Sequence, residues 1–134
     1  MMPLLFLAAA SADLDALDQA VAHCDRKISN PVFSAEASRR AQFLLDAYRE
    51  QESIVSDRLA IADQRRALRT AADMKPADVK QTQKQLDLRQ ADLDDRQKAL
   101  NDKRMLEGIR EDATDSMRRY FLSNCPAGAP EKGQ

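Results

Sequence analysis

The sequence predicts an all-α protein: a long antiparallel helical hairpin, coiled-coil-like, with a short N-terminal helix packed at its base. Four seven-residue blocks run from residue 83 to residue 110, and such a repeat keeps one stripe of a helix facing the same neighbour. Charged residues make up 32% of the chain and aromatic residues 4%, with three glycines and no tryptophan. This composition is typical of long, solvent-exposed helices with a thin core.

The first two helices are predicted from apolar spacing and from proline. Apolar residues recur three and four positions apart over residues 13–28, which indicates the stripe of an amphipathic helix. Asn30-Pro31 should end this helix, because the residue before a proline is pushed out of the α region. Ser34 is the expected N-cap of a second helix that reaches about Asp73.

The third helix carries the heptads. Met74-Lys75-Pro76 interrupts the helical pattern, and a proline suits the first position of a helix. A connection this short makes the two long helices antiparallel neighbours. Three phases repeat in the blocks, one apolar, one mostly glutamine and one basic. The seam of the hairpin is predicted to contain Leu44, Leu45, Tyr48, Val55, Leu59, Val79, Leu86, Leu93, Leu100, Leu106 and Ile109.

The first twelve residues differ from the rest of the chain. Residues 3–10 form an apolar run, and Ala10-Ser11-Ala12 offers the small-x-small pattern of a signal-peptidase site. The run is far shorter than the roughly 20 residues that span a bilayer. We therefore expect residues 1–12 to be a signal peptide, shortened at its start since no basic residue precedes the run. Residues 13–125 would form the helical hairpin domain and residues 126–134 a disordered tail. The alternative is an apolar first turn of the first helix.

The two cysteines support export independently of the leader. Cys24 and Cys125 make an even count in a small chain, which predicts one disulfide in an exported protein. Closing a loop of about 100 residues would stabilise the fold by roughly 4–5 kcal/mol in the chain-entropy model. The alternative is a pair of unrelated buried thiols in a cytosolic protein.

Catalysis and cofactor binding find little support in the residues. His23 is the only histidine, and it adjoins Cys24, so on a helix the two side chains point about 100° apart. These two residues with Cys125 would make a metal site only with awkward geometry. We therefore predict no enzyme activity, no cofactor and no metal.

A nucleic-acid partner is not expected either. Net charge is −1, so no overall field selects a polyanion. A basic cluster near the predicted hairpin tip is diluted by acidic residues and has no interleaved aromatic side chains for base stacking. The cluster contains Arg65, Arg66, Arg69 and Lys75.

These observations favour a non-enzymatic, periplasmic helical hairpin that serves as an interaction, scaffold or chaperone-like module in the bacterial envelope. In architecture it resembles the Skp-type periplasmic chaperones, but it has no strand-forming segment for their trimerisation body, so the resemblance transfers no residues and no activity. The alternative is a cytosolic coiled-coil adaptor or secretion or flagellar export chaperone with reduced cysteines. We expect a protein partner of unknown identity at the free end or flank of the hairpin, no stable membrane insertion, and a monomer or small homo-oligomer.

Overall fold

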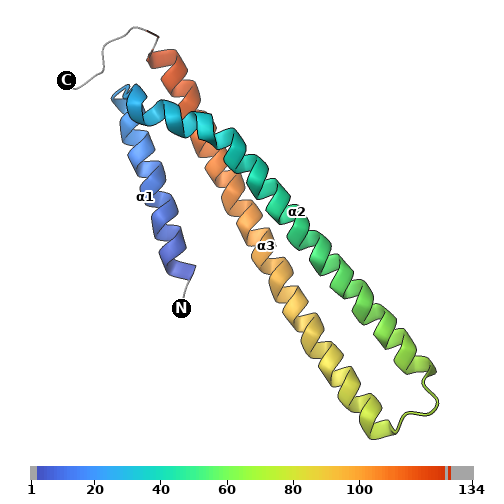
Figure 1. Cartoon of the computed structure of the whole chain (residues 1–134). Helices are drawn as coiled ribbons and strands as arrows, with labels where there is room; N and C mark the ends of the chain where they lie inside the picture. Colours follow the sequence, from blue (N-terminus) through green and yellow to red (C-terminus); the bar gives the residue numbers. More distant parts are fainter. Residues whose placement is uncertain (1–2, 126, 128–134) are drawn as a thin grey trace. The chain divides into compact units, whose positions relative to one another are not determined.

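The computed structural model describes residues 3–125 and 127, with the side chains of residues 1–12 left out. Its elements are α1 (Pro3–Ala22), α2 (Arg26–Thr70) and α3 (Pro76–Asn124) (Figure 1). The long helices α2 and α3 pack against each other in antiparallel fashion, and α1 contacts both. The described residues form no strand. The predicted fold class is therefore confirmed.

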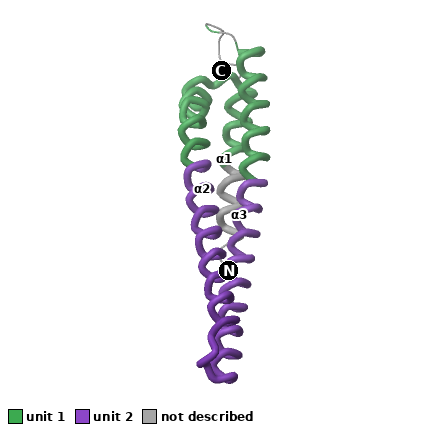
Figure 2. Tube along the Cα trace, turned by 90° about the vertical axis from the view of Figure 1, so that its right-hand side faces the viewer, with its two compact units in different colours: residues 1–42, 106–134 green, residues 43–105 purple. Residues whose placement is uncertain are grey.

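The chain divides into two units (Figure 2). Unit 1 comprises residues 1–42 and 106–134, that is, α1 with the first part of α2 and the last part of α3. Unit 2 comprises residues 43–105, in which the 71–75 connection joins the remainder of the two long helices. Each unit has apolar clusters of its own.

α1 ends in a Schellman motif at Cys24. The Asp25 N–H donates to the Ala20 carbonyl at 2.8 Å, and the Cys24 N–H donates to the Val21 carbonyl at 3.1 Å. These are the two hydrogen bonds that define the motif. Cys24 has a φ of 54°, the left-handed conformation in which a side chain costs about 1–2 kcal/mol relative to the right-handed one. A cysteine therefore stands where glycine would be the unstrained choice.

α2 begins eight residues before the predicted N-cap Ser34, which corrects the expected boundary. Asp25 is the N-cap instead: its Oδ1 accepts hydrogen bonds from the N–H groups of Lys27 at 3.1 Å and Ile28 at 3.3 Å. Pro31 lies inside the helix. It lacks the N–H that would donate to the carbonyl four residues earlier, and its ring crowds that carbonyl, yet α2 continues through it. Pro76 opens α3 as predicted.

The core of unit 2 is a heptad seam to which both helices contribute residues seven positions apart. Phe43 and Leu68 pack against it from partly buried positions. Residues with seven-residue spacing on two antiparallel helices keep meeting along their common length, and here they form two successive apolar clusters. Its buried members are Ala47, Ile54 and Ile61 from α2 and Leu86, Leu93 and Leu100 from α3.

The predicted α2 side of the seam was wrong. Tyr48 and Val55 each follow a buried seam residue by one position, which turns them by about 100° away from α3. α2 carries apolar residues on two adjacent faces, and the face with the two isoleucines is the buried one. The predicted α2 residues are exposed: Leu44 to 65%, Leu45 to 41%, Tyr48 to 63%, Val55 to 46% and Leu59 to 63%.

On α3 the predicted seam divides in two. The heptad leucines are buried, and Val79 is half-buried at the start of the phase. Leu106 and Ile109, in contrast, are 43% and 58% exposed. Both lie out of phase with Leu100, so the helix turns them away from the seam. Their assignment to the seam is corrected as well.

We expect Leu86→Ala to destabilise the protein by about 2–5 kcal/mol, because a buried leucine leaves a cavity when it is truncated. Leu88→Ala, two residues further on the same helix and 65% exposed, should cost no more than about 0.5 kcal/mol. Urea denaturation followed by circular dichroism measures both. Equal losses would mean that α3 faces α2 in another rotation.

Candidate functional site

The core of unit 1 joins all three helices around the two cysteines. Leu17 and Val21 of α1 lie with Phe121 of α3 in one buried cluster, and the Phe33 ring from α2 stands 5.7 Å from the Phe121 ring. Met117 of α3 is partly buried and packs against this cluster. α1 thus covers the end of the α2–α3 pair within unit 1.

The Cys24 and Cys125 sulfurs lie at disulfide distance, with the two Cα atoms 5.5 Å apart across a sequence separation of 101 residues. Arg26 closes the same end of α3. Its Nη2 donates to the Cys125 carbonyl at 2.8 Å, and its guanidinium lies 5.9 Å from the centre of the Phe121 ring. A cation at the C-terminus of a helix also interacts favourably with the helix dipole.

Within unit 1, the heptad phase of α3 continues with polar residues. Seven residues after Leu100 comes Glu107, followed at the same interval by Thr114 and Phe121. Thr114 is 2% exposed, and Glu36 of α2 is 7% exposed. We call Glu36, Glu107, Thr114 and the charged side chains that contact them the polar network. It was not predicted from the sequence, although its signal is present there: the apolar phase of α3 is interrupted by a carboxylate and a hydroxyl at two successive seam positions.

Arg39 links the buried carboxylate of Glu36 to the partly buried carboxylate of Glu107. Its Nη2 donates to Glu107 Oε1 at 2.6 Å and to Glu36 Oε1 at 2.7 Å. A second hydrogen bond reaches each carboxylate, at 2.9 Å to Glu107 and 3.1 Å to Glu36. Such bidentate pairs are the strongest that a guanidinium forms. The hydrogen bonds that Arg39 donates to Glu107 and then to Glu36 raise the pKa of Arg39.

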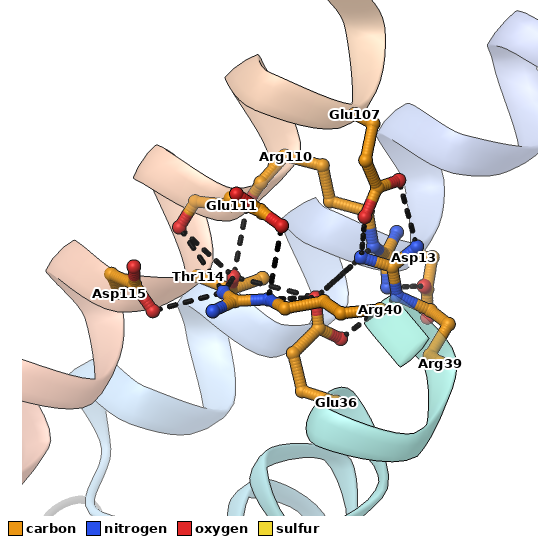
Figure 3. A network of polar contacts seen from close by, with 9 residues as sticks. All are labelled: Asp13, Glu36, Arg39, Arg40, Glu107, Arg110, Glu111, Thr114 and Asp115. Carbon is orange, nitrogen blue, oxygen red and sulfur yellow. Dashed lines mark hydrogen bonds and ion pairs between the residues drawn. The ribbon is translucent and has the colours of Figure 1, made fainter. Parts of the chain in front are cut away.

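Two further arginines complete the polar network (Figure 3). Arg40 Nη2 donates to Thr114 Oγ1 at 2.8 Å and to Asp115 Oδ1 at 2.9 Å. Arg110 Nη2 donates to Asp13 Oδ2 of α1 at 3.1 Å. The Nε atoms of Arg40 and Arg110 lie 3.5 Å and 3.6 Å from Glu36 Oε1. The polar network therefore contains residues of all three helices of unit 1.

Glu36 stands at the centre of the polar network. Burial is the largest single influence and by itself would raise the pKa of Glu36. The hydrogen bond from Arg39 and the charges of Arg39, Arg110 and Arg40 together outweigh it, so the pKa of Glu36 is lowered. A carboxylate enclosed by three guanidinium groups stays ionised and holds them together. The polar network holds the helices of unit 1 together, because each of its three arginines is paired with a carboxylate of another helix.

Unit 2 presents a different surface, which we call the α2 face: Leu44, Tyr48, Val55 and Leu59. All four are large apolar side chains of one helix and are exposed. Beside them, Gln51 and Gln97 exchange amide hydrogen bonds of 2.8 Å and 2.9 Å across the two helices. Exposed apolar residues gathered in a stripe mark interaction sites more often than single exposed leucines do.

The other residues that the sequence singled out are not brought together into a site. His23 is exposed in the turn between α1 and α2. Arg65 and Arg66 of the basic cluster lie at 2.8 Å and 3.9 Å from the carboxylates of Asp87 and Asp63. Among the described residues, no group of three or more His, Cys, Asp or Glu side chains is placed to hold a metal ion.

Comparison with protein-family models, curated proteins and solved structures finds no match to this chain. No helix in the described part combines the length and apolarity needed to cross a membrane. Residues 3–12 of the predicted leader belong to the backbone of α1, and their side chains are not described; of residues 126–134, on which the tail prediction rests, only Ala127 is described.

We expect stability to fall in acid through Glu36. A carboxyl group whose pKa is lowered by folding contributes stability above its unfolded pKa, and this stability is lost as pH falls through the folded value. The ordinary value for glutamate is 4.5, so the free energy of unfolding should decline below that pH. Urea titrations at several pH values should show a shallower decline for Glu36→Gln, measured against Asp102→Asn as an exposed control. An unchanged slope in Glu36→Gln would contradict this role.

We expect the cysteine pair to stabilise the fold by at most about 4–5 kcal/mol, the chain-entropy value for a loop of this length. Cys24→Ser with Cys125→Ser should lose that amount in urea denaturation. In a Cys125→Ser background, Cys24→Gly should be more stable than Cys24→Ala by about 1 kcal/mol, because only glycine adopts the left-handed conformation without strain. If alanine were the more stable, the turn at residue 24 would differ from the one described.

Proposed function

We propose that this chain is a non-enzymatic, exported helical-hairpin protein that serves as an interaction or scaffold module in the bacterial envelope, and that it binds a helical partner through the α2 face. The observation that carries the proposal is the exposure of four large apolar side chains along one helix, at 65%, 63%, 46% and 63% for Leu44, Tyr48, Val55 and Leu59. A chaperone-like role belongs to the same proposal, since apolar stripes also hold clients.

The spacing of the α2 face favours a helix as the partner. Leu44, Tyr48, Gln51 and Val55 follow one another at intervals of four, three and four, which is the spacing of a helix that packs lengthwise against another helix. The α2 face is one helix wide, because the exposed charged side chains of Arg49 and Glu52 border it on α2. An amphipathic helix laid along such a stripe would contact each apolar side chain in turn.

The rest of the molecule supports a role in binding rather than in chemistry. The charged groups of the polar network pair with one another, and their pairing holds the helices of unit 1 in place. Export is supported by the small-x-small sequence before Asp13 and by the approach of Cys24 to Cys125, which suits an oxidising compartment.

The proposal predicts cross-links from the α2 face in living cells. A photo-reactive phenylalanine analogue in place of Val55 or Leu59 should give covalent adducts under light, because a bound helix would lie against these side chains. The same analogue at Leu88, which is 65% exposed on α3, is the matched control. Adducts at residue 88 as strong as those at residues 55 and 59, or none at any position, would contradict the proposal.

Fractionation and thiol alkylation of the same cells test export. We expect the chain in the periplasmic fraction, with Cys24 and Cys125 protected from alkylation until a reductant is added. Freely alkylated cysteines in a cytosolic protein would replace export with the cytosolic adaptor interpretation and leave the cross-linking result to decide the binding role.

A further inference from the structure

We infer that the helix bound by the α2 face is α2 of a second copy, so that two hairpins associate through unit 2 into an antiparallel dimer. This inference rests on the proposed role of the α2 face as a helix-binding surface. It names the occupant of that surface, and it follows from the symmetry of the face, from its angle to the buried seam and from the charges at its border.

The apolar residues of the α2 face have a spacing that reads the same in both directions. From Leu44 to Tyr48 is four residues, from Tyr48 to Val55 seven, and from Val55 to Leu59 four again. A two-fold axis between Gln51 and Glu52 therefore sets Leu44 against Leu59 of the second copy, and Tyr48 against Val55. An isologous interface demands this self-complementarity, since each patch must meet itself reversed. A stripe shaped for an unrelated helix has no need of it.

The angle between the two apolar faces of α2 suits a four-helix arrangement. Each residue pair Ala47–Tyr48 and Ile54–Val55 puts a buried seam residue next to an exposed one, about 100° apart around the helix axis. A helix that packs on one neighbour through the first face and on another at nearly a right angle through the second occupies a corner of a four-helix bundle. The two α3 helices then lie on the same side of the plane that contains the two α2 helix axes.

The border of the α2 face carries complementary charges close to that axis. Arg49 and Glu52 are exposed, and neither forms an ion pair within the part of the chain that the structure describes. The two-fold axis brings Arg49 of each copy within one helical turn of Glu52 in the other. Two reciprocal ion pairs would thus flank the apolar contacts, and the opposite signs also disfavour a parallel pairing that sets like residues side by side.

Oligomeric state provides the first test, on the full chain with its cysteines intact. Sedimentation equilibrium should give the mass of two copies. Tyr48→Glu with Val55→Glu should raise the dissociation constant at least about a hundredfold, because carboxylates replace buried apolar contacts at the centre of the interface. Leu88→Glu should leave it unchanged. Because all three side chains are exposed in the single chain, circular dichroism should show that each variant keeps its helices.

Cysteine cross-linking tests the position of the axis. Glu52→Cys, beside the axis, should link to itself with a short bismaleimide. Leu44→Cys alone should not, since the two copies of residue 44 would stand roughly 22 Å apart along the helices. A mixture of Leu44→Cys and Leu59→Cys should link readily. Self-linking at residue 44 would show a parallel pairing and overturn the inference.

The outcomes separate this inference from the proposed function. A wild-type monomer whose residue 55 photo-cross-links to another protein would overturn the dimer and keep the helix-binding role. A dimer that survives Tyr48→Glu with Val55→Glu would also overturn the inference, because another surface would hold the copies together. A monomer with no adducts would overturn both.

Discussion

The residue type at one repeating position of α3, which recurs every seven residues, determines which interactions hold the helices together in each unit. From Leu86 to Phe121 one position in seven points into the interface with the neighbouring helices. In unit 2 that position holds leucine, and burial of apolar surface supplies the stability. In unit 1 the same position holds Glu107 and Thr114. Hydrogen bonds and ion pairs must therefore satisfy the carboxylate and the hydroxyl that the helix geometry turns toward the interface. The polar network follows from this change of residue type along an unchanged phase.

A buried carboxylate is costly unless its charge is matched, because water no longer solvates it. Glu36 meets this condition with three guanidinium groups, each from a position fixed by helix packing. Arg39 donates the hydrogen bonds to Glu36, and Arg40 and Arg110 add positive charge at 3.5 Å and 3.6 Å. The polar network therefore discriminates between the native arrangement of the three helices and arrangements that would satisfy apolar packing alone. A thin leucine seam by itself tolerates rotation and slippage far better than this network does.

The sequence predicts some of these elements well and others not at all. The heptads of α3 and Pro76 at its start followed from local rules. The buried face of α2 did not, because its apolar residues lie on two faces and periodicity cannot say which one meets α3. The start of α2 was predicted too late because Pro31 signals a helix boundary, whereas Asp25 caps a helix that continues through this proline. The polar network depends on contacts between residues some 70 positions apart, which no local pattern contains.

The bond between Cys24 and Cys125 has a mechanical consequence. It turns the chain between them into a closed ring that contains nearly all of α2 and α3. Tension applied to the two ends of the chain passes from one cysteine to the other and never loads the leucine seam. A single cut in the 71–75 connection likewise leaves both long helices covalently joined. In oxidising surroundings the helix pair is thus shielded from pulling and from nicking, and in reducing surroundings it would lose both protections together.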